Sequence, residues 1–99
     1  MWIGWIQFDV MLADVHSLKE KRAIIKPVLN ELRRKFTVVA SETKHMDLHR
    51  RSEISVAVIS GDASHVIEVL DSVDTFMVHR AELETLSARR RLINSEDIS

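Results

Sequence analysis

Hydrophobic positions along this chain follow two periods, and each change of period marks an expected element. Residues 2–12 are rich in β-branched and aromatic side chains, which favours a strand. Within 18–36 the apolar residues recur at helical spacing on one broad face. Residues 37–43 and 53–60 predict two more strands, joined by a polar and basic connection over 44–52.

The second half of the chain adds another helix and another strand. Asp62 follows a turn and is a good helix cap, so we expect a helix over 63–79 and a last strand over 82–93. This order predicts an α+β, ferredoxin-like βαββαβ fold: a four-stranded antiparallel sheet with both helices on one face. Residues 1–93 then form a single domain, and 94–99 form a flexible C-terminal tail.

The predicted sheet has a second face that the helices do not cover. In the first strand Ile6 and Phe8 point to one side, whereas Ile3 and Trp5 point to the other. Ile59 of the third strand joins the uncovered side. A second copy of the chain is the simplest cover for such apolar residues, so the sequence predicts a homodimer with Ile3, Trp5 and Ile59 in its interface.

The first helix opens on a capping box and contains a proline. Ser17 can accept a hydrogen bond from the first turn, and Glu20, three residues later, can reach back. Pro27 lacks the N–H that would bond to residue 23. We therefore expect a kink there, or a helix that restarts with Pro27 in its first turn.

Composition narrows the class of protein. Ninety-nine residues make one domain, and the absence of cysteine excludes disulfides and thiol nucleophiles. The N-terminus is neither a signal peptide nor a membrane span, so we expect a soluble, cytoplasmic protein without a membrane partner.

The formal net charge is −1, yet residues 1–51 carry ten Lys/Arg against six Asp/Glu, and 52–99 carry four against nine. A basic binding surface is compatible with this uneven distribution.

The positive charge concentrates in the first helix, where residues 17–35 hold seven Lys/Arg and two Glu. On a helical wheel Lys19, Arg22, Lys26 and Arg33 lie within about 60° of one another, beside the apolar face. Such a stripe suits phosphate contacts along a nucleic-acid backbone. The alternative is a solvated flank whose long side chains cover hydrophobic edges.

Lys21 falls within the apolar sector of the same wheel. Two placements are open to it: the side chain snorkels past the first turn, or it points to an anion held near the helix start. Arg50 and Arg51 would extend a basic surface. The arginines at 89–91 either extend it too or pair with glutamates across the sheet.

His45 and His49 have the i, i+4 spacing that places two rings on one face of a helix. Met46, however, occupies the place of the glutamate in the zinc-protease H-E-x-x-H motif, and the segment has the composition of a turn. We therefore predict a solvated or hydrogen-bonded histidine pair, with no metal site and no cofactor. No nucleophile context or glycine-rich phosphate loop is present either, so an enzyme is not predicted.

Three sequence segments carry a family resemblance: S-L-K-E-K-R over 17–22, L-R-R-K-F over 32–36, and D-L-H-R-R over 47–51 running into I-S-V-A-V over 54–58. Together they resemble the YlxP-like family of small uncharacterised bacterial proteins. Two positions depart from many members, which have Trp at the position of His49 and a better helix former at that of Pro27. The resemblance implies a ferredoxin-like fold, self-association and gene neighbours concerned with translation, and it implies no reaction.

Three functional hypotheses follow. The first is a non-catalytic protein that binds RNA or a ribosomal particle through its first helix, with phosphates held by Lys19, Lys21, Arg22, Lys26 and Arg33 and the patch extended by Arg50 and Arg51. The second is a homodimeric protein-interaction module without nucleic-acid binding. The third is a small enzyme or sensor that binds a phosphorylated ligand at the N-terminus of the first helix.

Overall fold

The elements follow one another in the order that the hydrophobic pattern predicts. The structure is a computed structural model and describes residues 1–98. Its elements are β1 (Trp2–Leu12), α1 (Leu18–Lys35), β2 (Val39–Lys44), β3 (Arg51–Ser60), α2 (Ala63–Val78), β4 (Leu83–Asn94) and a 3-10 helix, η1 (Ser95–Ile98).

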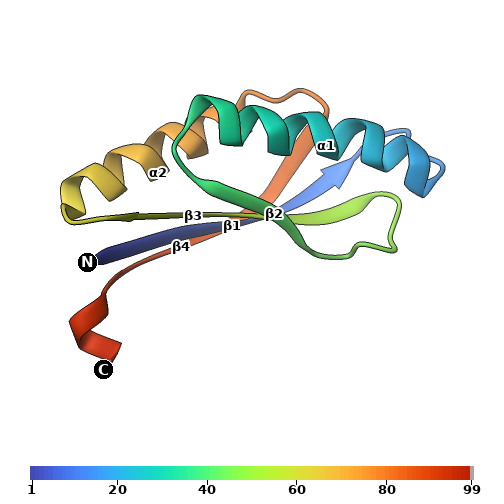
Figure 1. The fold of residues 1–99 in the computed structure, drawn as a ribbon. Coiled ribbons are helices and arrows are strands. Elements are labelled where there is room, and N and C mark those ends of the chain that lie inside the picture. Colours follow the sequence, from blue (N-terminus) through green and yellow to red (C-terminus); the bar gives the residue numbers. More distant parts are fainter. Residues whose placement is uncertain (99) are drawn as a thin grey trace.

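The four strands form one antiparallel sheet in the order β2-β3-β1-β4. α1 and α2 lie on the same side of this sheet, and the other side is bare apart from η1, which extends from the end of β4 on that side (Figure 1). The predicted α+β, ferredoxin-like fold is therefore confirmed. No helix among residues 1–98 is long and apolar enough to cross a membrane.

The core lies between the sheet and the two helices. In β1 the side chains at even positions from Ile6 to Leu12 are buried, while those at odd positions are only half-buried, which is the alternation expected of a strand with one covered face. Gly4 continues the covered side, where α2 comes so close that a β-carbon would clash with Val66 Cγ1 and lie 2.8 Å from Leu70 Cδ1.

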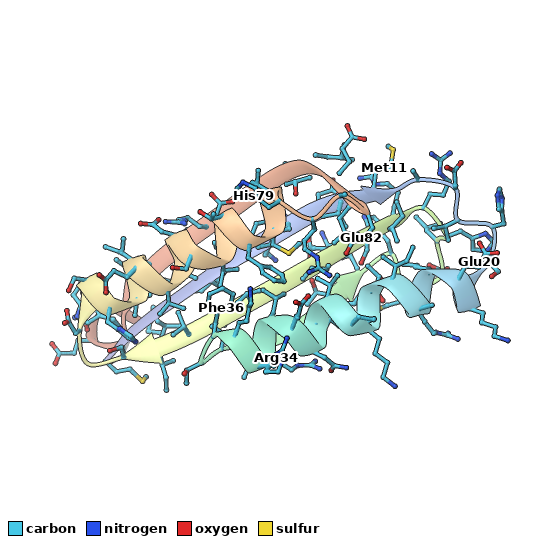
Figure 2. The ribbon with its side chains drawn as sticks, turned by 90° about the horizontal axis from the view of Figure 1, so that it is seen from above. Met11, Glu20, Arg34, Phe36, His79 and Glu82 are labelled. Atoms are coloured by element: carbon cyan, nitrogen blue, oxygen red, sulfur yellow. The ribbon has the colours of Figure 1, made fainter. Side chains whose placement is uncertain are left out.

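The two helices meet at their C-terminal ends, above the middle of the sheet. Seen from above, Arg34 and Phe36 lie at the end of α1 and His79 at the end of α2, whereas Glu20 lies far away at the start of α1 (Figure 2). The Phe36 and Phe76 rings pack edge to face with centroids 5.9 Å apart. This contact positions the C-terminal end of α1 against α2. The first turns of α1 lie at the other end of the helix, beside the β2–β3 connection.

The expectation that α1 restarts at Pro27 is wrong. One helix runs from Leu18 to Lys35 with Pro27 inside it, and no new helix starts there. Pro27 is exposed, while Ile25, Val28 and Leu32 on the opposite side are buried against the sheet. Buried apolar residues come both before and after Pro27 in the sequence. Their burial stabilises a continuous helix despite the missing hydrogen bond.

Several boundaries differ from expectation, among them that of β2, which begins at Val39 rather than 37. β3 begins at Arg51 rather than 53, because Arg51 and Ser52 pair with Met11 and Val10 of β1. β4 runs to Asn94, after which the segment predicted to be a tail forms η1, and the Ser95 N–H donates to the Met1 carbonyl (2.8 Å). Ser99 lies outside the described residues.

Candidate functional site

The start of α1 is held by the chain's own side chains. The Ser17 hydroxyl accepts a hydrogen bond from the Glu20 N–H (3.1 Å), as expected of a helix cap. The Glu20 carboxylate reaches back and accepts from the His16 N–H (2.8 Å). Because a carboxylate already lies at this helix end, a phosphorylated ligand would meet like charge there.

Lys21 contradicts both sequence expectations. Its side chain is only 2% exposed, so it neither snorkels into solvent nor lies free to hold a phosphate. Its Nζ lies 2.8 Å from Glu42 Oε2 and donates to the His45 carbonyl (2.6 Å). The Ser52 hydroxyl donates to the same carboxylate oxygen (2.6 Å). Lys21 therefore ties α1 to β2 and to the β2–β3 connection, and it leaves the list of RNA contacts.

The basic stripe of α1 divides into free and tethered side chains. Lys19, Arg22 and Lys26 are exposed, and none of them has an ion-pair or hydrogen-bond partner within residues 1–98. Arg33 is also exposed, but it donates to the Ala40 carbonyl of β2 (2.5 Å) and to Asn30 Oδ1 (3.4 Å). We name Lys19, Arg22 and Lys26 the free basic flank.

Arg50 and Arg51 do not extend this flank freely. Arg50 Nε donates to the Leu12 carbonyl (3.0 Å), which ties the connection to the end of β1. Arg51 lies on the bare side of the sheet, where its Nη2 contacts both Asp9 carboxylate oxygens at 2.7 and 2.8 Å. Arg51 pairs with Met11, whose side chain is on the side of the sheet away from the helices. Paired residues in neighbouring strands point to the same side, so Arg51 lies on the side of the sheet opposite to α1.

A groove runs beside the free basic flank, between α1 and the β2–β3 connection. Its volume is about 180 Å³. Its walls are apolar and come from Leu18, Ile25, Leu29 and Met46. It is also lined by Arg22 and Lys26 of the free basic flank and by the Lys21–Glu42 ion pair. We name it the α1 groove. Sequence reasoning missed it because Glu42 and Met46 join α1 only through the packing of the sheet.

The bare face of the sheet brings together the predicted dimer residues. Ile3 pairs with Ile59 on one side and with Ile93 on the other, and Trp5 lies level with Ala57 in the next row. Ile59 is 64% exposed. Beside this patch lies a hollow of about 380 Å³ lined by Trp5, Gln7, Val39, Ala40, Ser41, Thr43, Ser55, Val56 and Ala57.

Charges on the bare face largely neutralise one another. Glu53 is 4% exposed, accepts from Thr43 Oγ1 (2.6 Å) and pairs with Arg89 (3.2 Å), which confirms pairing across the sheet for that arginine. Arg90 pairs instead with Asp71 of α2 (2.8 Å). Arg91, level with Trp5 on the bare face, is exposed and has no ion-pair partner within residues 1–98, so this face keeps an unpaired cation.

His45 and His49 do not share a helix face, because residues 45–50 form turns and bends. His45 has a positive φ of 64°. His49 lies with His16 and Asp47 around an open hollow of about 540 Å³. Within residues 1–98 no group of three or more His, Cys, Asp or Glu is arranged to hold a metal ion.

Comparison with known proteins gives two matches. The sequence profile DUF503, described as a protein of unknown function, matches residues 3–90. The chain is also similar to a Bacillus subtilis (strain 168) protein named "Uncharacterized protein YlxP". The two are 31% identical over 87 residues, which cover 88% of this chain and 95% of the Bacillus protein. Both matches include the segments on which the YlxP-like resemblance depends.

Proposed function

Because this chain belongs to the DUF503 family of proteins of unknown function, we propose its function from its surface: it is a cytoplasmic, non-catalytic protein that binds RNA or a ribosomal particle. The free basic flank contacts the phosphates. The observation that carries the proposal is three exposed cations, Lys19, Arg22 and Lys26, without a partner within residues 1–98.

The spacing of these cations supports the proposal. From Lys19 to Lys26 the helix rises by about 10 Å, so long side chains on one flank can reach successive phosphates of one strand. Asp71 and Glu82 of the acidic second half pair with Arg90 and Arg80 rather than with the flank. The flank keeps its positive potential available to a polyanion.

Salt dependence tests the proposal directly. Three phosphate contacts on single-stranded RNA predict that log K falls with log salt concentration at a slope of about −2. We would measure fluorescence anisotropy of a labelled RNA across a salt series. The variant Lys19→Gln, Arg22→Gln, Lys26→Gln should lose most of the affinity and of the slope.

A charge-matched variant serves as the control. Arg34→Gln, Arg90→Gln, Arg91→Gln removes three exposed cations outside the flank and should bind RNA nearly as the wild type does. Equal affinity of the flank variant and the wild type would overturn the proposal. Capture of a lysate partner that survives nuclease treatment would favour a protein-interaction module instead.

We also propose that the chain is a homodimer through the bare face of its sheet. Ile3, Trp5, Ile59 and Ile93 form an uncovered apolar patch, and the neighbouring carboxylates already have arginine partners. Charges that are already paired lose less than unpaired ones when a second copy removes water from this face. In a two-fold symmetric dimer, the hollow beside Trp5 can receive the Trp5 side chain of the second copy.

Light scattering at micromolar concentration tests the dimer. Ile59→Asp should give a monomer, because it places a charge in the apolar patch. Ile67→Asp is the matched control: Ile67 is 43% exposed on α2, on the other side of the molecule, and its replacement should leave the dimer intact. A monomeric wild type would contradict this second proposal.

A further inference from the structure

The sheet has two edges, and the chain protects only one of them. β2 forms the first edge, where the strand is six residues long, shifts register between Glu42 and Lys44, and has its Ala40 carbonyl covered by a hydrogen bond from Arg33 (2.5 Å). Short length, irregular register and a covering side chain all hinder the addition of another strand.

β4 forms the second edge and lacks these devices over most of its length. It pairs with β1 in one unbroken register from Ser87 to Asn94, and β1 is its only neighbour in the sheet. Within residues 1–98 no side chain bonds to the backbone of 87–94. Every second residue of an antiparallel strand directs its N–H and C=O away from the neighbour it pairs with. The outer edge of β4 is therefore a template for a further strand.

The helix side of this edge is apolar. Ala88 and Leu92 lie on that side, because they pair with Phe8 and Gly4 of β1. Both are exposed, so apolar surface continues from the core to the margin of the sheet. Side chains of an added strand that point to the helix side would contact these two residues, which favours apolar residues there.

The bare side of the same edge is basic. Arg91 is exposed and has no ion-pair partner within residues 1–98. Arg89, two residues away on the same side, is 64% exposed although it pairs with Glu53. Directly opposed side chains of neighbouring strands have β-carbons about 5 Å apart, so acidic residues of an added strand would lie next to these arginines.

The arginines also argue against a second copy of β4 as the added strand. Antiparallel pairing of two copies about Arg90 would bring Arg89 of each opposite Arg91 of the other. Like charges directly opposite one another destabilise a strand pair. The edge is thus complementary in charge to an acidic strand and not to itself.

We infer that the outer edge of β4 binds an extended segment of a partner protein as a fifth strand, with acidic residues on the bare side and apolar residues on the helix side. Asp71, which pairs with Arg90 on the helix side, disfavours acidic residues there. The inference does not rest on the proposed RNA binding, because α1 packs over β2 at the opposite edge of the sheet.

Fluorescence anisotropy with the full-length chain and a labelled octapeptide tests the inference. The probe is acetylated and amidated V-E-V-E-V-E-V-E, which alternates apolar and acidic residues as the edge requires. We expect it to bind about tenfold more tightly than V-K-V-K-V-K-V-K, which reverses the charge. It should exceed V-V-E-E-V-V-E-E by a similar factor, because that peptide keeps the composition and loses the alternation.

Backbone methylation separates strand pairing from simple charge attraction. Two versions of the probe carry N-methyl groups on alternate residues, one on the valines and one on the glutamates. Only one of these sets has its N–H groups directed at β4, so one version should lose binding and the other should keep it. Equal affinity of the two methylated versions would overturn the inference.

Variants of the chain locate the contact. Arg91→Gln should weaken binding of the V-E probe about threefold, the size expected of one opposed charge pair, whereas Arg34→Gln, an exposed cation on α1, should leave it unchanged.

The same preparations separate this inference from the proposed function. Loss of RNA binding in the Lys19→Gln, Arg22→Gln, Lys26→Gln variant with unchanged binding of the V-E probe would support two separate surfaces. A wild-type chain that binds RNA but not the V-E probe, or that binds the V-E and V-K peptides equally, would overturn the β4 inference and leave the proposed function standing.

Discussion

Replacing Lys21 with methionine tests the buried ion pair that joins the first helix to the hairpin. Methionine keeps the length and much of the volume of the side chain but removes its charge. Glu42, whose side chain is 20% exposed, would then keep only the Ser52 hydroxyl as a donor. The His45 carbonyl would lose the Lys21 donor and keep the Leu48 N–H.

The expected loss follows from these contacts. Removing one partner of a buried ion pair costs about 3–5 kcal/mol when the other charge is left uncompensated. The partial exposure of Glu42 and its remaining bond to Ser52 reduce this, so we expect Lys21→Met to lower the free energy of unfolding by about 2–4 kcal/mol. For a chain of this length that corresponds to a fall in Tm of roughly 10–25 °C.

Urea unfolding followed by circular dichroism at neutral pH measures the loss, with the exposed Lys26→Met as a control expected within about 0.5 kcal/mol of wild type. The double variant Lys21→Met, Glu42→Gln removes both charges and should recover at least half of the loss. A single variant as stable as wild type, or a double variant whose loss is the sum of the two single losses, would refute the reasoning.

Three further substitutions test the fold. Pro27→Ala should raise the free energy of unfolding by about 2 kcal/mol in urea titration, because proline in an exposed helix interior costs about 3 kcal/mol relative to alanine and its stiffening of the unfolded chain offsets part of that; an unchanged midpoint would contradict this. Gly4→Ala should cost about 1–3 kcal/mol in a thermal melt, since α2 leaves no room for the β-carbon, and an unchanged Tm would count against that packing. The hydrogen bond from the Ser64 hydroxyl, with that from its N–H, lowers the pKa of Asp62 below its ordinary value. The stabilisation by Asp62 is therefore present above its ordinary pKa and lost as pH falls through the lower, folded-state pKa; Asp62→Asn should keep the cap and flatten this part of the stability profile below about pH 4, and an identical acid profile would contradict the assignment.

Local pattern was sufficient for the elements and their caps. Alternation in β1, the helical spacing in α1 and α2, and the cap residues Ser17 and Asp62 depend on neighbours a few positions away. Their physical causes act within one strand or one turn, so a single sequence contains them. The order of the elements then restricted the topology to the fold that is observed.

Pro27 shows where local reasoning fails for a helix. Propensity alone predicts a break, since proline removes a donor and crowds the preceding turn. The helix continues because Ile25, Val28 and Leu32 are buried against a sheet made largely of residues far along the chain. Tertiary packing outweighs local propensity here.

The availability of each charge depends on the tertiary structure. The sequence by itself determined that α1 carries excess positive charge and that Lys21 lies in its apolar sector. Only the packing of α1 over β2 decided that Lys21 meets Glu42, and only strand pairing decided that Arg51 lies on the other side of the sheet, against Asp9. The physical reason is range: periodicity acts over a few residues, whereas the partner of a charge is chosen by register and layer packing across the whole chain.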